Sequence, residues 1–252
     1  MPERPTPDEI VADLGEGWRS GSFLAGLDPQ VRANLLAAGE LVSFPAGSRL
    51  IVEGWNDDDT FLILRSFAKV TASLSEGGEA LLTVRVGGDV VGEMAALDGS
   101  PRSATVTACG RVPLSAVRIG AGLFREIVAR DGASSLRLGA SISAKLRAAN
   151  RSRVDYTSLP PVQRMAKSLL ELADACGRNT GTGGVIIQAS LTQIELGTLI
   201  GVKRATAERA VARLRSRGLI DTAGRLPIVR DLAELRRFAE RPRMPSDEGL
   251  VD

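Results

Sequence analysis

Two charged residues, Glu93 and Arg102, are the best candidates in this sequence for binding a small ligand. Glu93 follows Gly92, and Arg102 precedes Ser103, with a short helical turn expected between the two pairs. An arginine fork and the backbone amides at a short helix start both suit the oxygens of a phosphodiester. An ionised glutamate only accepts hydrogen bonds, so it can take the proton of a ribose hydroxyl. The pattern predicts recognition of a sugar phosphate; an internal Glu93–Arg102 ion pair without a ligand is the alternative.

The second candidate surface is the basic stretch from Lys203 to Arg217. Before it, Thr192 and Glu195 have the spacing of a helix capping box, and Gly201 allows a sharp turn. After it, residues 219–229 are expected to form a hairpin. The stretch contains Lys203, Arg204, Arg209, Arg213, Arg215 and Arg217 against a single acid, Glu208. This order of features predicts a winged helix-turn-helix that binds DNA, and a solvated amphipathic helix pair is the alternative.

Two kinds of element must position the first candidate site. Residues 23–38 carry apolar side chains at intervals of three and four, which predicts a helix. From Leu41 to Val117 the pattern changes to short β-prone runs separated by glycines. Many short strands at close spacing predict a small β-barrel or roll.

A long helix is expected from about Ala133 to Asp155. One apolar stripe along it contains Leu138, Ile142, Leu146 and Ala149, and the basic residues Lys145, Arg147, Arg151 and Arg153 are expected to be solvated. The stripe fits packing on the helix's own domain and a two-helix dimer seam equally well. Pro160 and Pro161 cannot continue a helix, so the domain boundary is expected there, with another helix from Val162 to Cys176.

Composition excludes several classes of function. The chain of 252 residues has no histidine and two cysteines 67 positions apart, Cys109 and Cys176. Histidine-based catalysis, a proximal-histidine haem and an intrachain metal cluster are therefore not expected. The only acidic cluster, Asp57 to Asp59, is expected on a solvent-facing turn. Charges interrupt every apolar window and no secretory signal is visible, so we expect a cytoplasmic protein that is not an enzyme, without a membrane segment.

Two stretches resemble the Crp/Fnr family of transcription regulators. Residues 87–106 are similar to the phosphate-binding cassette of cyclic-nucleotide-binding domains. The run from Gly201 to Arg209 resembles the family's recognition-helix pattern, Gly-x-x-Arg-x-Thr-x-x-Arg. The resemblance covers about Leu41 to Leu235. It implies an α+β fold, in which a jelly-roll-like antiparallel β-roll is joined by a long dimerisation helix to a C-terminal winged helix-turn-helix.

The resemblance also implies domain bounds, ligands and partners. The expected segments are a tail (1–20), the sensor (21–132), the dimerisation helix (133–156), the DNA-binding domain (157–240) and a second tail (241–252). The residues expected at a cyclic mononucleotide, cAMP above others, are Gly92, Glu93, Met94, Ala95, Arg102, Ser103 and Asn150. Those expected at DNA are Thr192, Lys203, Arg204, Thr206 and Arg209. A homodimer would bind a near-palindromic operator and act with RNA polymerase, with no catalytic residue, metal or cofactor.

Four positions depart from the family's pattern. Ser66 stands where a glycine is usual in a hairpin, which predicts strain or a different turn. Ala205 replaces a glutamate that many members carry, and Gly197 replaces an alanine within a helix. Members that respond to cAMP have a polar pair where this chain has Ala149 and Asn150, so that only Ala149 departs from the pattern. The alternatives are a DNA-binding regulator whose sensor is constitutive or responds to a non-nucleotide signal and, less favoured, a cyclic-nucleotide-regulated enzyme subunit.

Overall fold

A computed structural model describes residues 17–181, 183–223 and 226–241. Most of the two predicted tails, and residues 224–225 of the expected wing, lie outside the described residues. The chain divides into two compact units, the first within residues 1–79 and 83–146 and the second within 80–82 and 147–252. No helix among the described residues combines the length and the apolar character that crossing a membrane requires.

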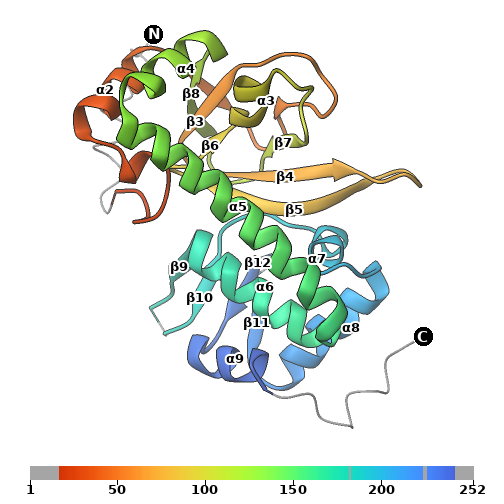
Figure 1. Cartoon of the computed structure of the whole chain (residues 1–252). Coiled ribbons are helices and arrows are strands. Elements are labelled where there is room, and N and C mark those ends of the chain that lie inside the picture. Colours follow the sequence, from red (N-terminus) through yellow and green to blue (C-terminus); the bar gives the residue numbers. More distant parts are fainter. Residues whose placement is uncertain (1–16, 182, 224–225, 242–252) are drawn as a thin grey trace. The chain divides into compact units, whose positions relative to one another are not determined.

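The first unit is built on two antiparallel four-stranded sheets (Figure 1). Its strands are β1 (Glu40–Phe44), β2 (Arg49–Ile51), β3 (Thr60–Arg65), β4 (Phe67–Ser73), β5 (Glu79–Val86), β6 (Val90–Val91), β7 (Thr105–Ala108) and β8 (Leu114–Ile119). One sheet has the order β1-β8-β3-β6 and the other β2-β7-β4-β5. Strands distant in sequence are neighbours, as in a jelly roll, and this confirms the predicted β-roll.

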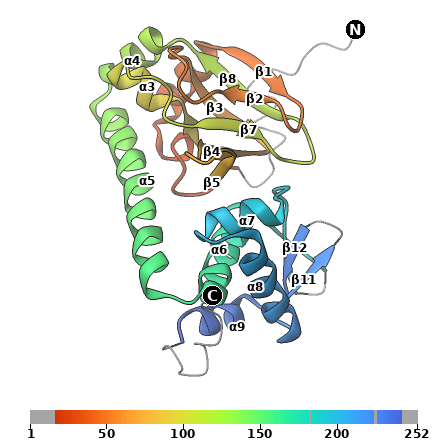
Figure 2. The same cartoon turned by 90° about the vertical axis from the view of Figure 1, so that its right-hand side faces the viewer.

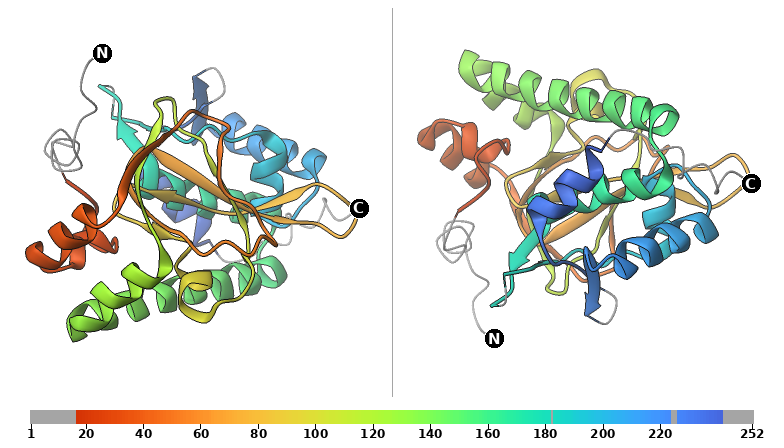
Figure 3. Two further views of the ribbon diagram at one scale, coloured as in Figure 1. Left: turned by 90° about the horizontal axis from the view of Figure 1, so that it is seen from above. Right: turned by 90° about the horizontal axis from the view of Figure 1, so that it is seen from below.

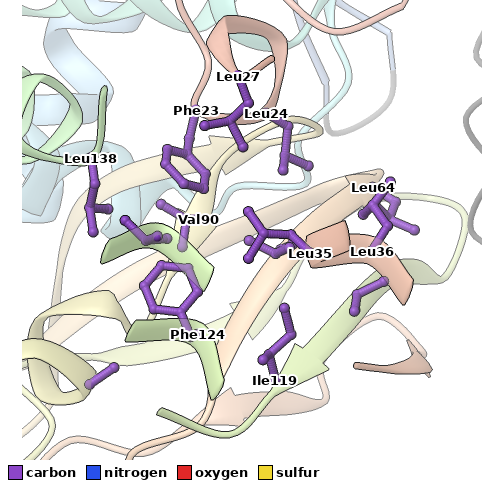
Figure 4. Packing of buried hydrophobic residues seen from close by; sticks show 14 of the residues in the cluster. Phe23, Leu24, Leu27, Leu35, Leu36, Leu64, Val90, Ile119, Phe124 and Leu138 are labelled. Atoms are coloured by element: carbon purple, nitrogen blue, oxygen red, sulfur yellow. The ribbon is translucent and has the colours of Figure 1, made fainter. Parts of the chain in front are cut away.

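Apolar side chains from both ends of this unit meet in one core (Figure 4). The rings of Phe23 and Phe124 lie 6.4 Å apart between centroids. Leu35, Leu64 and Val90 are completely buried beside them. A second cluster includes Phe61, and the partly buried Phe44 packs against it with its ring edge-on to that of Phe61. This packing fixes the short strand β6, which leads directly into the candidate ligand site.

The predicted helix over residues 23–38 is wrong as a single element. The chain forms a 3₁₀ turn, η1 (Leu24–Gly26), and then a helix, α2 (Pro29–Ala37). Asp28 has extended backbone and its carboxylate accepts from the backbone amide of Gln30 at 2.8 Å. Proline is accommodated at the first position of a helix and not in its interior, so Pro29 starts a new helix.

Three further helices complete the first unit and lead out of it. They are α3 (Glu93–Asp98), α4 (Ala121–Arg130) and α5 (Gly132–Ser158). Figures 2 and 3 show α3 beside α4 and the first half of α5. The predicted stripe of α5 divides: Leu138 is buried and Ile142 packs against the core, whereas Leu146 is 62% exposed and Ala149 is also exposed. Packing on its own domain therefore accounts for only the first half of the stripe.

The second unit contains helices and a small sheet. The elements are α6 (Pro161–Cys176), β9 (Gly177–Asn179), β10 (Val185–Ile187), α7 (Gln193–Leu199), α8 (Arg204–Ser216), β11 (Ile220–Ala223), β12 (Leu226–Val229) and α9 (Leu232–Ala239). Figure 2 shows the strands β11 and β12 at one edge of the helices. Helix α6 packs against α8 and α9 through buried residues such as Met165 and Leu169. Strand β12 of the β11–β12 hairpin pairs with β10, and β10 pairs with β9; the sequence did not predict β9 or β10.

Candidate functional site

The expected ligand site is formed where β6 turns into α3. Gly92 has φ +84°, a conformation that few other residues tolerate. A Cβ added there would lie 2.6 Å from the Asp59 carbonyl oxygen and 2.7 Å from Nη1 of Arg102. The backbone of Gly92 therefore approaches both the β2–β3 loop and Arg102 as only a glycine can. Glu93 follows immediately as the first residue of α3.

Arg102 is buried and held by four hydrogen bonds. Its side chain is 1% exposed. Nε and Nη2 donate to the two carboxylate oxygens of Asp57 at 2.9 and 3.1 Å. Nη2 also donates to the Asp59 carbonyl oxygen at 2.7 Å, and Nη1 donates to the Gly92 carbonyl oxygen at 3.1 Å. The guanidinium thus joins the β2–β3 loop to the start of α3, and its hydrogen bond lowers the pKa of the Asp57 carboxyl.

The acidic cluster faces solvent at Asp57 and Asp58, as expected, but it also makes contacts that the sequence did not indicate. Asp57 is half-exposed but binds Arg102, and the Asp59 carboxylate lies 3.8 Å from Arg118. The sequence places three acids in a loop between strands, which marks the loop as a candidate. No local pattern links these acids to Arg102, which lies 45 residues after Asp57. Among the described residues, no group of three or more histidine, cysteine, aspartate or glutamate side chains is arranged to hold a metal.

Glu93 has a partner that the sequence analysis missed. Lys145 of α5 donates from Nζ to Oε1 of Glu93 at 2.8 Å and to the Val90 carbonyl oxygen at 2.8 Å. The expectation of a solvated Lys145 is therefore wrong. The Glu93 side chain is 4% exposed, and a buried carboxylate requires a counter-ion of this kind. Burial lowers the pKa of Lys145, and the Glu93 carboxylate opposes that shift. The alternative of a Glu93–Arg102 ion pair is also wrong, because each has a different partner.

The remaining expected ligand residues differ in exposure. Met94 and Ser103 are exposed, and Met94 Sδ lies 4.0 Å from Ser103 Oγ. Ala95 is buried, so it can contribute only backbone groups. Asn150 is exposed on α5 and belongs to the second compact unit. The first unit therefore brings together every expected ligand residue except Asn150.

The second candidate site has the predicted helix-turn-helix. Thr192 caps α7, with Oγ1 accepting from the Glu195 amide at 3.1 Å and the Glu195 carboxylate accepting from the Thr192 amide at 2.7 Å. The capping box is thus confirmed. Gly201 has φ +68° in the turn before α8. A Cβ at Gly197 would lie 3.0 Å from the Val202 carbonyl oxygen, so glycine permits the close approach of the two helices.

Helix α8 presents the predicted basic residues to solvent. Lys203, Arg204 and Arg209 are exposed, and Thr206 is half-buried. Arg204 Nε donates to Glu208 at 2.7 Å, and Arg209 Nη2 donates to Thr206 Oγ1 at 3.3 Å. Pairs between exposed side chains one helical turn apart are weak, so both arginines can exchange these partners for phosphate or base atoms.

The end of α5 is attached to the turn of this motif by contacts inside the second unit. Tyr156 donates its hydroxyl to the Leu199 carbonyl oxygen at 2.9 Å. A Cβ at Gly201 would lie 3.3 Å from the Tyr156 ring. Arg164 of α6 lies over the same ring, with 5.6 Å from Cζ to the centroid, and donates to the Ile200 carbonyl oxygen at 2.7 Å. The ring of Tyr156 therefore packs against the turn that precedes the recognition helix.

Comparison with known proteins matches both units to described domains. Residues 41–131 match the cyclic nucleotide-binding domain, and residues 163–238 match the Crp-like helix-turn-helix domain. A relative from Mycobacterium tuberculosis, named a CRP-like cAMP-activated global transcriptional regulator, is 31% identical over 234 residues, which are 92% of this chain and 99% of the relative.

Solved structures show the same fold. A CRP/FNR-family transcriptional regulator from Thermus thermophilus has a TM-score of 0.67 and 24% identity, covering 80% of this chain and 99% of the other. The global regulator CLP of Xanthomonas campestris has a TM-score of 0.67 and 17% identity, covering 81% and 100%. The two matched domains and the relative of nearly equal extent show that this chain belongs to the Crp/Fnr family of DNA-binding transcription regulators.

Proposed function

We propose that this regulator is a cytoplasmic homodimer that binds a cyclic mononucleotide, preferably cAMP, and a near-palindromic operator, and that it acts with RNA polymerase. The observation that carries the ligand assignment is the buried pair of opposite charges beside Gly92. Arg102 and Glu93 are both nearly inaccessible, yet each is held in place by several contacts. Burying two charges costs desolvation free energy that their partners must offset, and buried charges of this kind are typical of functional sites.

The ribose and the phosphate of a cyclic nucleotide each have a matching group at this site. Lys145 contacts Oε1 of Glu93, which leaves Oε2 as the acceptor for a ribose 2′-hydroxyl. Ser103 is exposed next to Arg102 and offers a hydroxyl donor to the phosphate. The name of the mycobacterial relative, a cAMP-activated regulator, supports cAMP as the first candidate.

A second candidate effector has a specific observation in its favour. The structure of the Xanthomonas regulator, which shares this fold, is described as responsive to c-di-GMP. A likeness of fold therefore leaves the effector open, and a cyclic dinucleotide competes with the mononucleotide. The residues favour the mononucleotide, because one carboxylate and one arginine match one ribose and one phosphate.

Calorimetric titration of the purified chain distinguishes these ligands. The proposal expects binding of cAMP, and at least tenfold weaker binding of 2′-deoxy-cAMP, because Glu93 would lose its donor while remaining buried. Cyclic GMP and c-di-GMP complete the series, and Arg102→Ala, checked for folding by circular dichroism, should bind cAMP at least tenfold more weakly. Absence of heat with every cyclic mononucleotide at millimolar concentration would refute the proposed effector and leave the DNA-binding regulator with another signal.

DNA recognition is assigned to the residues that α8 exposes. We propose that Arg204 and Arg209 reach guanine edges or phosphates, while Lys203 and Thr206 contact the backbone. Thr192 Oγ1 already accepts from the Glu195 amide, so its remaining role is to donate its proton to a phosphate. Ala205 offers only a methyl contact, so this regulator should not select the base that a glutamate would select there.

A further inference from the structure

The hydrogen-bond capacity of Arg102 is almost used up within the protein. A guanidinium has five N–H groups. Two donate to Asp57, one to the Asp59 carbonyl oxygen and one to the Gly92 carbonyl oxygen. Only one N–H of Nη1 remains outside these contacts, and the side chain is 1% exposed. In this state Arg102 presents no two-donor edge to a ligand.

The edge that suits a phosphodiester best is the one that Asp57 covers. Nε and Nη2 of an arginine form a fork that binds either a carboxylate or two phosphate oxygens in the same bidentate geometry. Asp57 makes both bonds of that fork, at 2.9 and 3.1 Å. A phosphate that approached without displacing Asp57 would meet a second negative charge. The carboxylate and the phosphate therefore compete for the same two donors.

We propose that Asp57 is an internal competitor of the cyclic phosphate, so that nucleotide binding displaces its carboxylate from Arg102 and Asp57 sets the affinity of the site. This inference rests on the nucleotide assignment above. Two features make the exchange feasible. The Asp57 side chain is 44% exposed, so its carboxylate can turn into water. Arg102 keeps two backbone acceptors, Asp59 and Gly92, which hold the guanidinium when Asp57 leaves.

Protonation does not relieve this competition near neutral pH. The hydrogen bond from Arg102 lowers the pKa of Asp57 below its ordinary value of 3.8. Asp57 therefore stays ionised between pH 5 and pH 8, a range that lies above that pKa. Asp58, Asp59 and Arg118 are also charged at this loop, and Arg118 Nε lies 3.8 Å from the Asp59 carboxylate. The difference in affinity caused by Asp57 should consequently be the same across that range.

Titration of cAMP into three proteins tests the inference. Asp57→Asn removes the charge but keeps the size of the side chain, and it should bind cAMP about three- to tenfold more tightly than wild type. Asp58→Asn is the matched control, because it removes the same charge from the same exposed loop, where no contact between Asp58 and Arg102 is seen. The control should bind like wild type. Thermal melts of the ligand-free proteins establish that both variants are folded.

If Asp57 has the opposite role, the affinity for cAMP should change in the opposite direction. If Asp57 instead positions Arg102 for the ligand, Asp57→Asn will bind cAMP equally or more weakly, and the inference is overturned. If Asp57→Asn does not fold, Asp57 is required for the structure of the domain, and this outcome also overturns the inference. If neither wild type nor Asp57→Asn binds any cyclic nucleotide, the proposed effector itself fails. If Asp57→Asn binds cAMP and wild type does not, the result would support both the proposed effector and the competition between Asp57 and the phosphate.

Discussion

Ser66 has a backbone conformation that its neighbours in the fold stabilise. It is the only non-glycine residue with positive φ among those described, at +73°, which confirms the predicted strain. Its hydroxyl donates to the Val112 carbonyl oxygen at 2.9 Å. Gly110 lies opposite, and a Cβ there would be 1.9 Å from Ser66 Oγ. The serine keeps its strained conformation because a hydrogen bond and a facing glycine accommodate it.

This arrangement predicts a coupled pair of substitutions. Gly110→Ala should lower the free energy of unfolding by about 1–3 kcal/mol, because its methyl group collides with Ser66 Oγ. Ser66→Gly removes that oxygen and relieves the positive φ, but loses one hydrogen bond, so its own effect should stay within about 1 kcal/mol. Chemical denaturation of the double variant should show recovery of most of the loss. If the two substitutions change the free energy of unfolding additively, the proposed collision between residue 110 and Ser66 Oγ would be contradicted.

The end of α5 is connected by side-chain contacts to the turn that precedes α8. Lys167 of α6 binds the Asp155 carboxylate at 2.8 Å, one residue before Tyr156. Tyr156 and Arg164 then hold the backbone of the turn from Leu199 to Gly201. Burial raises the pKa of Tyr156, so its hydroxyl remains a donor at neutral pH. We therefore propose that a change in the direction of α5 reaches the turn before α8 through these packed side chains.

Substitutions of Tyr156 test this link. Tyr156→Ala should reduce the effect of cAMP on operator affinity to less than half of its wild-type free energy, because the ring that transmits the change is absent. Tyr156→Phe keeps the ring and loses one hydrogen bond, so it should retain most of the effect. The operator affinity of both variants, with and without cAMP, can be measured by fluorescence anisotropy on an operator selected from random duplexes.

Two measurements complete this test. Val154→Ala shortens a side chain that is 62% exposed on the same helix and serves as the control. Nucleotide affinity, measured by calorimetry, should be unchanged in every variant, because Tyr156 belongs to the second compact unit and the cassette to the first. An unaltered response in Tyr156→Ala would mean that the signal takes another route.

For the molecule as a whole, the features that sequence reasoning predicted are those with local signals. The capping box at Thr192, the turn at Gly201 and the helix break before Pro161 each depend on a few adjacent residues. The β-roll was predictable as a class, but its strand order was not, because β3 pairs with β8 across more than 40 residues. The division of the helix before Pro29 was missed because the apolar spacing continues across it.

The sequence indicates candidate residues for the ligand site but not the contacts that these residues make. Arg102 is 45 residues from Asp57, and Glu93 is 52 residues from Lys145. No local pattern specifies pairs at such separations; they follow from the way the roll and α5 fold together. Lys145 was expected in water because most lysines are solvated. The buried carboxylate at Glu93 reverses that preference.

We assign the dimer interface to the exposed face of α5. Leu136, Ser143 and Asn150 are spaced by seven residues, and Leu146 falls between them, as in a coiled-coil seam. Leu136 and Leu146 are 78% and 62% exposed, whereas Ile142 packs on the core of its own unit. Leu146 is therefore the better position for a test, since a charge at Ile142 would also damage the fold.

Leu146→Asp should convert the dimer to a monomer of 26.6 kDa in light scattering, because an unpaired charge in an apolar seam is strongly unfavourable. Leu74→Asp makes the same change at a leucine that is 46% exposed between β4 and β5, and it should remain dimeric. The monomer should bind an operator with two half-sites at least tenfold more weakly, while affinity for a single half-site stays the same, since two-fold symmetry is what joins the half-sites. A Leu146→Asp protein that stays dimeric would place the interface on another surface and remove Asn150 from the partner-facing seam.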